Sequence, residues 1–123
     1  MNNKGQVLVL FVILIPVLII VSALIVDTGL ILKEKSKLVG TTKVIMAEMI
    51  DEGKTTAQAQ ELYIENDIPV ANLEITQEGT TIKIKNSYQI KSAFGDIIGI
   101  SSYKINIIIE AYKKENKIIF NKE

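Results

Sequence analysis

The sequence predicts an α+β protein in which a long N-terminal helix, transmembrane in its first half and amphipathic in its second, packs on a small antiparallel sheet. Three observations predict this class. A twenty-residue apolar run opens the chain, a helical repeat follows it, and the second half alternates apolar and polar residues with a period of two. We expect residues 1–32 to form the leader and membrane helix and residues 33–123 the helix-and-sheet domain.

The apolar run extends from Val7 to Val26, and seventeen of its twenty residues are Val, Leu, Ile or Phe. As a helix it is about 30 Å long, which matches the hydrocarbon core of a bilayer. The apolar residues favour insertion by about 5–10 kcal/mol. Pro16 near its midpoint removes one backbone hydrogen bond and is expected to kink the helix.

The run does not fit a cleavable secretory signal, because such signals have apolar cores of about 7–15 residues followed by a cleavage site of small residues. Here Ser22 and Ala23 lie inside the run. We therefore expect a retained anchor. Charge alone leaves the orientation open, since Lys4 lies on one side and three lysines follow on the other.

Beyond the membrane the helix is expected to continue to Gly53, a glycine suited to a helix C-terminus. One face carries an apolar stripe with helical spacing, Leu38, Thr42, Ile45 and Met49. This stripe could bind a partner or cover the protein's own sheet, and we favour the second. A second helix is expected from Thr56 to Asn66, with Thr55 and Gln58 forming a capping box.

The period then changes to two. Alternation predicts a strand over residues 71–76, a turn at 77–80 and a strand over 82–91 with a lysine-rich outer face. Residues 92–100 are expected to form a short helical or looped crossover with Phe94, Ile97 and Ile98 turned inward. A third strand is expected over 103–111, a charged turn over 113–117, and a marginal fourth strand over 118–120.

The composition contains little catalytic chemistry. Histidine, cysteine, tryptophan and arginine are absent, which removes imidazole and thiolate metal ligands, thiol and imidazole nucleophiles, and the guanidinium groups typical of nucleic-acid surfaces. The acidic pairs, Asp51–Glu52 and Glu65 with Asp67, lack calcium-loop spacing and are interpreted as solvated ends or turns. We expect no enzyme activity, no cofactor, no metal and no nucleic-acid or small-molecule partner.

Two residue groups have two interpretations. Lys83, Lys85 and Lys91 form a basic stripe that could contact an anionic lipid or polymer, but a solvated strand face is favoured. Asp27, at the end of the apolar run, either has a function at membrane depth or marks the point where the helix leaves the membrane.

Three motifs follow one another in the N-terminal region: Gly5–Gln6, then Ile15–Pro16 within a long aliphatic run, then Asp27-Thr28-Gly29 at the expected membrane exit. In their order and spacing they resemble the N-terminal region of TadE/TadG-like proteins, pilin-like minor components of the Tad (Flp-type) pilus assembly system. The segment from Ala93 to Ile100, followed by a strand ending at Ala111, is similar to the C-terminal region of the same proteins. The resemblance implies a pilin-like fold.

One residue departs from the family pattern. Pilin-type leaders are cut after a glycine, here Gly5 before Gln6, and pilins and TadE-like members typically have glutamate at the fifth mature position. That position is Leu10. We therefore expect an uncut leader, closer to the TadG-like subgroup.

The resemblance implies a pseudopilin in Tad/Flp-type pilus assembly, secretion or surface adherence. It implies a single-pass protein of the cell membrane with a cytoplasmic N-terminus and an extracytoplasmic C-terminal domain. The implied partners are the lipid bilayer, other pilin-like subunits and platform proteins of the pilus system. The alternative is a single-pass membrane adaptor or regulatory subunit unrelated to pili.

Overall fold

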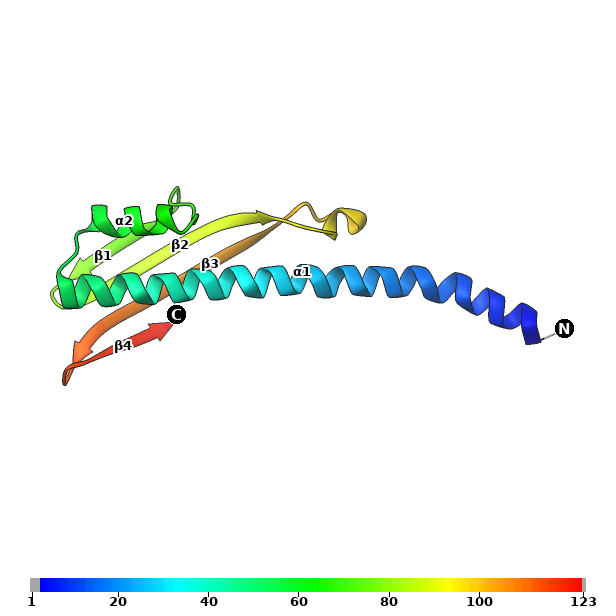
Figure 1. Ribbon diagram of the computed structural model, residues 1–123, viewed down its shortest axis with the longest axis horizontal. Coiled ribbons are helices and arrows are strands. Elements are labelled where there is room, and N and C mark those ends of the chain that lie inside the picture. Colours follow the sequence, from blue (N-terminus) through cyan, green and yellow to red (C-terminus); the bar gives the residue numbers. More distant parts are fainter. Residues whose placement is uncertain (1–2, 123) are drawn as a thin grey trace.

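The computed structural model describes residues 3–122 and has the predicted α+β architecture. A 50-residue helix packs along part of its length on a four-stranded antiparallel sheet (Figure 1). The elements in chain order are α1 (Asn3–Glu52), α2 (Thr56–Glu65), β1 (Glu74–Glu78), β2 (Thr81–Lys91), the 3₁₀ turn η1 (Gly95–Ile98), β3 (Ser102–Lys114) and β4 (Lys117–Lys122).

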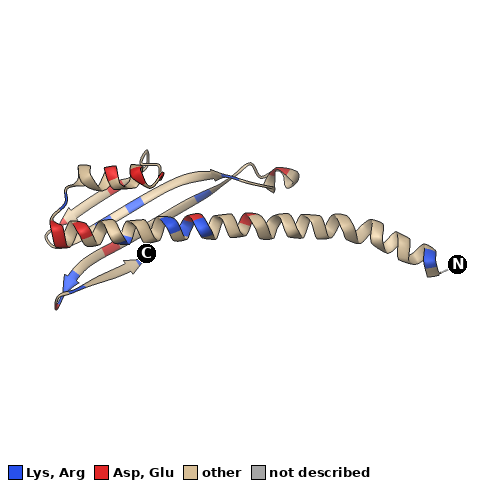
Figure 2. Cartoon of the chain, viewed as in Figure 1, with Lys and Arg blue, Asp and Glu red and all other residues tan. Residues whose placement is uncertain are grey.

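Helix α1 has two halves with different surroundings. The N-terminal half projects beyond the sheet and is almost free of charge, whereas charged residues gather on the half beside the sheet (Figures 1 and 2). The helix continues through Pro16, and its N-terminal end bends away from the axis of the remainder (Figure 1). It ends as predicted before Gly53, whose φ of +66° suits a residue without a Cβ.

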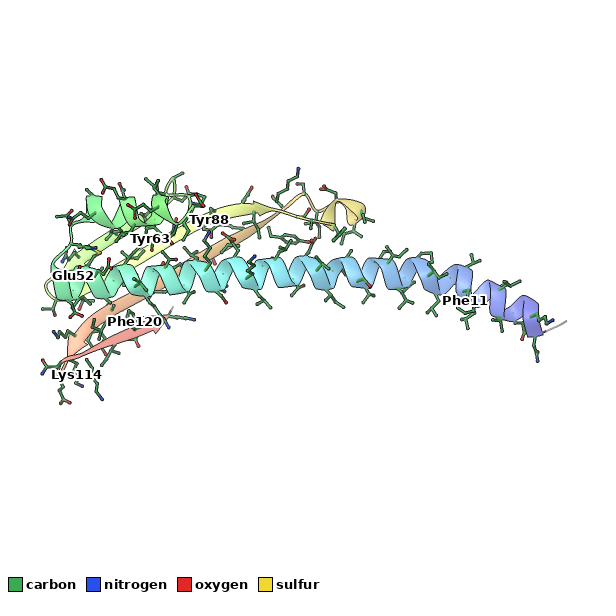
Figure 3. All side chains as sticks on the ribbon, viewed as in Figure 1. Phe11, Glu52, Tyr63, Tyr88, Lys114 and Phe120 are labelled. Carbon is green, nitrogen blue, oxygen red and sulfur yellow. The ribbon has the colours of Figure 1, made fainter. Side chains whose placement is uncertain are left out.

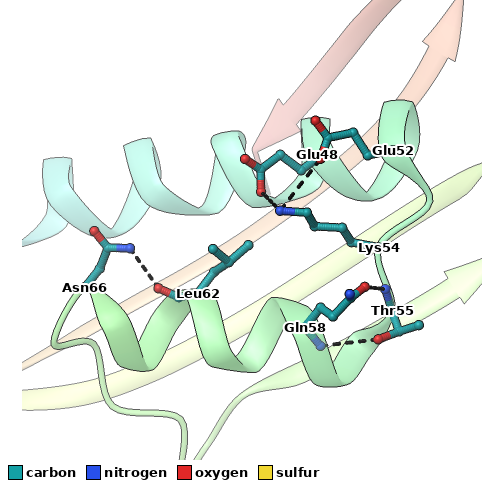
Figure 4. Close-up of polar contacts among 7 residues, drawn as sticks. All are labelled: Glu48, Glu52, Lys54, Thr55, Gln58, Leu62 and Asn66. Atoms are coloured by element: carbon teal, nitrogen blue, oxygen red, sulfur yellow. Dashed lines mark hydrogen bonds and ion pairs between the residues drawn. The ribbon is translucent and has the colours of Figure 1, made fainter.

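Helix α2 begins with the predicted capping box (Figure 4). The Thr55 hydroxyl accepts from the Gln58 backbone N–H at 3.3 Å, and the Gln58 side chain accepts from the Thr55 N–H at 2.9 Å. Lys54, in the link between the helices, donates to Glu48 of α1 at 2.8 Å. These contacts fix the turn that lays α2 beside α1.

The four strands form a meander in the order β1-β2-β3-β4. The first strand starts three residues later than predicted and ends two residues later, because residues 71 and 72 form a turn and β1 spans Glu74–Glu78. The second strand, β2, ends at Lys91 as predicted and starts one residue earlier, at Thr81. Glu78 pairs with Thr81, so the connection is only Gly79-Thr80, with Gly79 at φ +57°. A glycine at the first turn position permits this tight connection.

The last hairpin is longer than the sequence pattern indicated. Strand β4 has six residues, all paired with β3, and the predicted charged turn shortens to Glu115-Asn116. Both turn residues have positive φ, +52° and +64°. This conformation matches the twist of the two strands it joins, so the pairing extends to Lys114 and Lys117.

The core lies between one face of the sheet and the C-terminal half of α1, with α2 contributing from the side. Its buried apolar residues are Leu38, Ile45, Met46, Met49, Ala59, Tyr63, Ile68, Ile82, Ile84, Tyr88, Ile105, Ile107, Ile109 and Ala111. The predicted alternation in β2 and β3 is confirmed by this set. Lys83, Lys85 and Lys91 lie on the exposed face.

One prediction about side-chain direction is wrong. Phe94, Ile97 and Ile98 do not turn inward: they are 44%, 61% and 43% exposed. The segment that carries them extends past the end of the sheet and lies over the middle of α1 (Figure 1). No sheet core exists at that level, so their apolar surfaces face the bare half of α1 and the surroundings.

Candidate functional site

The predicted packing stripe of α1 is buried. Leu38, Thr42, Ile45 and Met49 are at most 3% exposed and lie in the core or beside it, so the stripe covers the protein's own sheet. Met46 joins them although it lies one residue off the predicted spacing. This face is therefore not available for a partner.

The predicted leader and membrane-helix residues lie along the uncovered part of α1. Gly5 and Gln6 are within the helix, and Pro16 and Gly29 are exposed on it. An added Cβ at Gly5 or Gly29 would meet nothing within 4 Å. Whether the chain is cut after Gly5 stays a prediction.

Asp27 is the exception on this part of the helix, because it is only 1% exposed. Its carboxylate accepts hydrogen bonds from the segment after β2. Oδ1 accepts from the backbone N–H groups of Ala93 and Phe94, each at 3.0 Å, and Oδ2 accepts from the Tyr103 hydroxyl at 2.8 Å. We call this arrangement of Asp27, Ala93, Phe94, Gly95 and Tyr103 the carboxylate clasp.

Gly95 lets the segment approach the carboxylate closely. A Cβ built at this position would lie 2.7 Å from the Ile100 carbonyl oxygen, 2.8 Å from the Tyr103 hydroxyl and 3.0 Å from Oδ2 of Asp27. Two of these distances are shorter than real Cβ contacts. Any side chain here would push the segment off α1, so glycine is required for packing.

The clasp is the first of three contacts in which a tyrosine hydroxyl meets a polar group of α1. The Tyr88 hydroxyl donates to Glu34 at 2.9 Å. Farther along, the Tyr63 and Thr42 hydroxyls lie 2.6 Å apart. Figure 3 shows Tyr63 and Tyr88 between α1 and the elements that carry them.

The surroundings of these tyrosines favour the protonated form. Burial, opposed by the hydrogen bond with Thr42, raises the pKa of Tyr63 to about 12. Burial, followed by the hydrogen bond and the charge of Glu34, raises the pKa of Tyr88. The hydrogen bond to Asp27, followed by burial, raises the pKa of Tyr103. All three hydroxyls are therefore protonated at neutral pH.

The sequence contained a signal for the clasp that the stripe prediction missed. The spacing of four and three that joins Leu38 to Met49 continues toward the N-terminus through Glu34 and Ile31 to Asp27. Asp27 therefore lies on the packed face of α1. Its partners in the segment after β2, 66 and 67 positions away, had no comparable signal.

An apolar groove lies directly N-terminal to the clasp. It has a volume of about 450 Å³ and is formed between one face of α1 and the segment over it. Its lining residues are Ile15, Leu18, Ile19, Ser22, Ala23, Val26, Phe94 and Ile97.

The clasp has the chemistry of a structural joint. Its partners are neutral N–H and O–H donors, which satisfy a carboxylate that burial would otherwise penalise. Among residues 3–122, no group of three or more acidic side chains is placed to hold a metal ion.

Comparisons with protein-family models, with curated proteins and with solved structures found no significant match to this chain. The fold is nevertheless pilin-like in architecture, with a long apolar N-terminal helix followed by a small four-stranded antiparallel sheet.

Proposed function

We propose that this chain is a membrane-anchored, pilin-like protein of a Tad/Flp-type pilus assembly system, with its N-terminus in the cytoplasm and its sheet domain outside. In this role α1 crosses the bilayer and contacts other pilin-like subunits and assembly-platform proteins. The sheet domain contributes to pilus assembly, secretion or surface adherence.

The observation that carries the proposal is the contrast between the two halves of α1. An 18-residue window near the N-terminus has a mean hydropathy of 3.4 and none of it is buried within the protein. The half beside the sheet supplies the core. A helix of a water-soluble domain would bury such a surface, so its exposure favours lipid or other apolar helices as the surroundings.

A second line of support is the motif order quoted from the sequence. Ile15–Pro16 lies within the exposed half, and Asp27-Thr28-Gly29 lies where the exposed half ends and the packed half begins. In TadE/TadG-like proteins the corresponding residues lie within and at the exit of the membrane helix.

Topology is tested by labelling in intact cells, which the absence of cysteine makes simple. Asn3→Cys and Glu115→Cys place single thiols near the two ends of the chain, both at exposed positions. A membrane-impermeant maleimide is expected to label Glu115→Cys in intact cells and Asn3→Cys only after lysis. Labelling of Asn3→Cys alone in intact cells would contradict the proposed orientation.

Participation in pilus assembly is tested by site-specific photo-crosslinking in the native host. A photoreactive residue at Phe11, which is 52% exposed on the bare half of α1, is expected to capture a short pilin or a second pilin-like subunit. The matched control is Ile64, 58% exposed on α2. If Phe11 is membrane-embedded but captures only proteins unrelated to pili, the adaptor alternative replaces the pilus proposal.

A further inference from the structure

The segment Ala93–Ile100 combines exposed apolar side chains with backbone N–H groups that are mostly hydrogen-bonded within the protein. Phe94, Ile97, Ile98 and Ile100 are all at least 36% exposed. Asp96 is the only ionisable residue of the segment. Such a cluster of apolar side chains at one end of a small domain marks a contact surface.

The backbone N–H groups of this segment are largely satisfied without water. Ala93 and Phe94 donate to Asp27, as described for the clasp. Within the segment, Ile97 donates to Phe94 at 3.1 Å, Gly99 to Asp96 at 3.2 Å and Ile100 to Gly95 at 2.8 Å.

The two flanks of the segment are also joined. The Ser92 N–H donates to the Ser101 carbonyl at 3.0 Å, and the Ser92 hydroxyl donates to the Ile100 carbonyl at 2.8 Å. In an irregular segment exposed to water, solvent can satisfy such groups. A segment that enters a low-dielectric phase needs partners within the protein, because each unpaired backbone group there costs several kcal/mol.

The depth of the segment follows from its neighbours on α1. Phe94 and Ile97 line the apolar groove together with Ser22 and Ala23, which precede Asp27 by five and four residues. At 1.5 Å per residue these two lie about 6–8 Å below the clasp along the helix axis. Interfacial elements typically bury their apolar face about 5–10 Å into the boundary between headgroups and acyl chains.

We propose that Ala93–Ile100 is a second membrane-contacting element, a wedge that inserts Phe94, Ile97 and Ile98 into the leaflet where α1 leaves the bilayer. The proposal rests on the proposed membrane crossing by α1. The bilayer is the occupant that the fold favours, because the wedge is continuous with the exposed apolar surface of α1 at the same level.

In this arrangement the clasp has a specific task. Asp27 satisfies the first two N–H groups of the wedge, and these donors together with the Tyr103 hydroxyl solvate its carboxylate in place of water. Exposed lysines 33, 35 and 37 follow on α1, about 9–15 Å beyond Asp27, at the level of the headgroups.

The test uses single tryptophans, since the chain contains none. The full chain is reconstituted in vesicles whose lipids carry bromine on the acyl chains, which quenches tryptophan in the hydrocarbon. Ile97→Trp probes the wedge and Val12→Trp, at a position 72% exposed, probes the membrane helix. Ile64→Trp on α2 is the control, because Ile64 and Ile97 are exposed to similar extents, 58% and 61%.

We expect the wedge and helix probes to lose most of their emission to the brominated lipid and the α2 probe to lose little. If Val12→Trp is quenched and Ile97→Trp is not, the proposed insertion of Ala93–Ile100 is wrong, whereas the proposed membrane crossing by α1 is supported. If Val12→Trp is not quenched, the proposed membrane function fails, and the wedge fails with it.

A second measurement uses cysteine and so avoids the bias that the preference of tryptophan for membrane interfaces could introduce. Ile97→Cys and Ile64→Cys are reacted with a water-soluble maleimide in the same vesicles. The wedge predicts much slower labelling of Ile97→Cys. Equal labelling rates for the two variants would overturn the wedge. Slow labelling of Ile97→Cys together with its cross-linking to a second protein chain would also overturn it, because protein rather than lipid would then cover the segment.

Discussion

Replacing Asp27 with alanine should release the wedge while leaving the core folded. The substitution removes the acceptor of two backbone N–H groups and one hydroxyl. Hydrogen bonds to a charged group contribute about 1.5–3 kcal/mol each. The three share one carboxylate and the freed donors regain water once the wedge lifts away, so about half of the sum, roughly 3 kcal/mol, is the expected loss.

This loss can be measured as hydrogen exchange of the full chain in lipid nanodiscs. A weakening of local closure by roughly 3 kcal/mol corresponds to about 10²-fold faster exchange. The acceleration should be confined to residues 92–100, because the core around Ile45 and Ile109 lies at the other end of the sheet-covered half of α1.

Asp27→Asn is the matched control. Its amide oxygen can still accept from Ala93 and Phe94, and its amide nitrogen can donate to the Tyr103 oxygen. We expect it to cost only about 1 kcal/mol. Unchanged protection of residues 92–100 in the alanine variant would refute the clasp as the joint between α1 and the wedge.

Three further predictions concern other sites. Gly95→Ala should accelerate hydrogen exchange of the wedge and cost about 1–3 kcal/mol, because its Cβ would lie 2.7 Å from the Ile100 carbonyl oxygen. The control Gly29→Ala has open space around its Cβ and should stabilise α1 by up to about 1 kcal/mol. Equal effects of the two substitutions would contradict the close approach at Gly95. Tyr63 has a folded pKa of about 12 against an ordinary value of 10.0. Protonated Tyr63 therefore contributes about 3 kcal/mol to the free energy of unfolding below pH 10, and this contribution is lost as pH rises from 10 to 12. Denaturant unfolding across this pH range measures the loss. Tyr63→Phe should reduce the dependence of the unfolding free energy on pH. Intact mass of the membrane-extracted protein should include the residues up to Gly5; a product starting at Gln6 would show that the leader is cut.

The elements beside the core were predictable because their periodicities reflect burial within one chain. The spacing of Leu38, Thr42, Ile45 and Met49 identified the packed face of α1, and Thr55 with Gln58 identified the start of α2. Each signal lies within a few residues of the structure it predicts. The extent of β4 was harder to predict, since its pairing with β3 begins directly after a turn that needs positive φ at Glu115 and Asn116.

The wedge and its clasp were not predictable in the same way. An apolar side chain such as Ile97 signals removal from water, but the pattern does not say whether protein or lipid removes it. Asp27 meets Ala93 across 66 positions, and a backbone N–H has no side-chain signature in the sequence. The small size of Gly95 permits the contact with the carboxylate, and a glycine in a short apolar segment does not reveal this role in the sequence.

The unbroken course of α1 has a mechanical consequence. No break in the helix separates the exposed apolar half from the half that carries the sheet, and the clasp braces the transition. In the proposed membrane arrangement the two halves therefore tilt and rotate together. Met49 lies 22 residues beyond Asp27, or about 33 Å along the rod. A tilt of about 20° from the bilayer normal, the average for membrane helices, would displace that end sideways by roughly 11 Å relative to an upright helix. In the proposed arrangement, the angle at which α1 leaves the bilayer would thus set the position of the sheet domain above it.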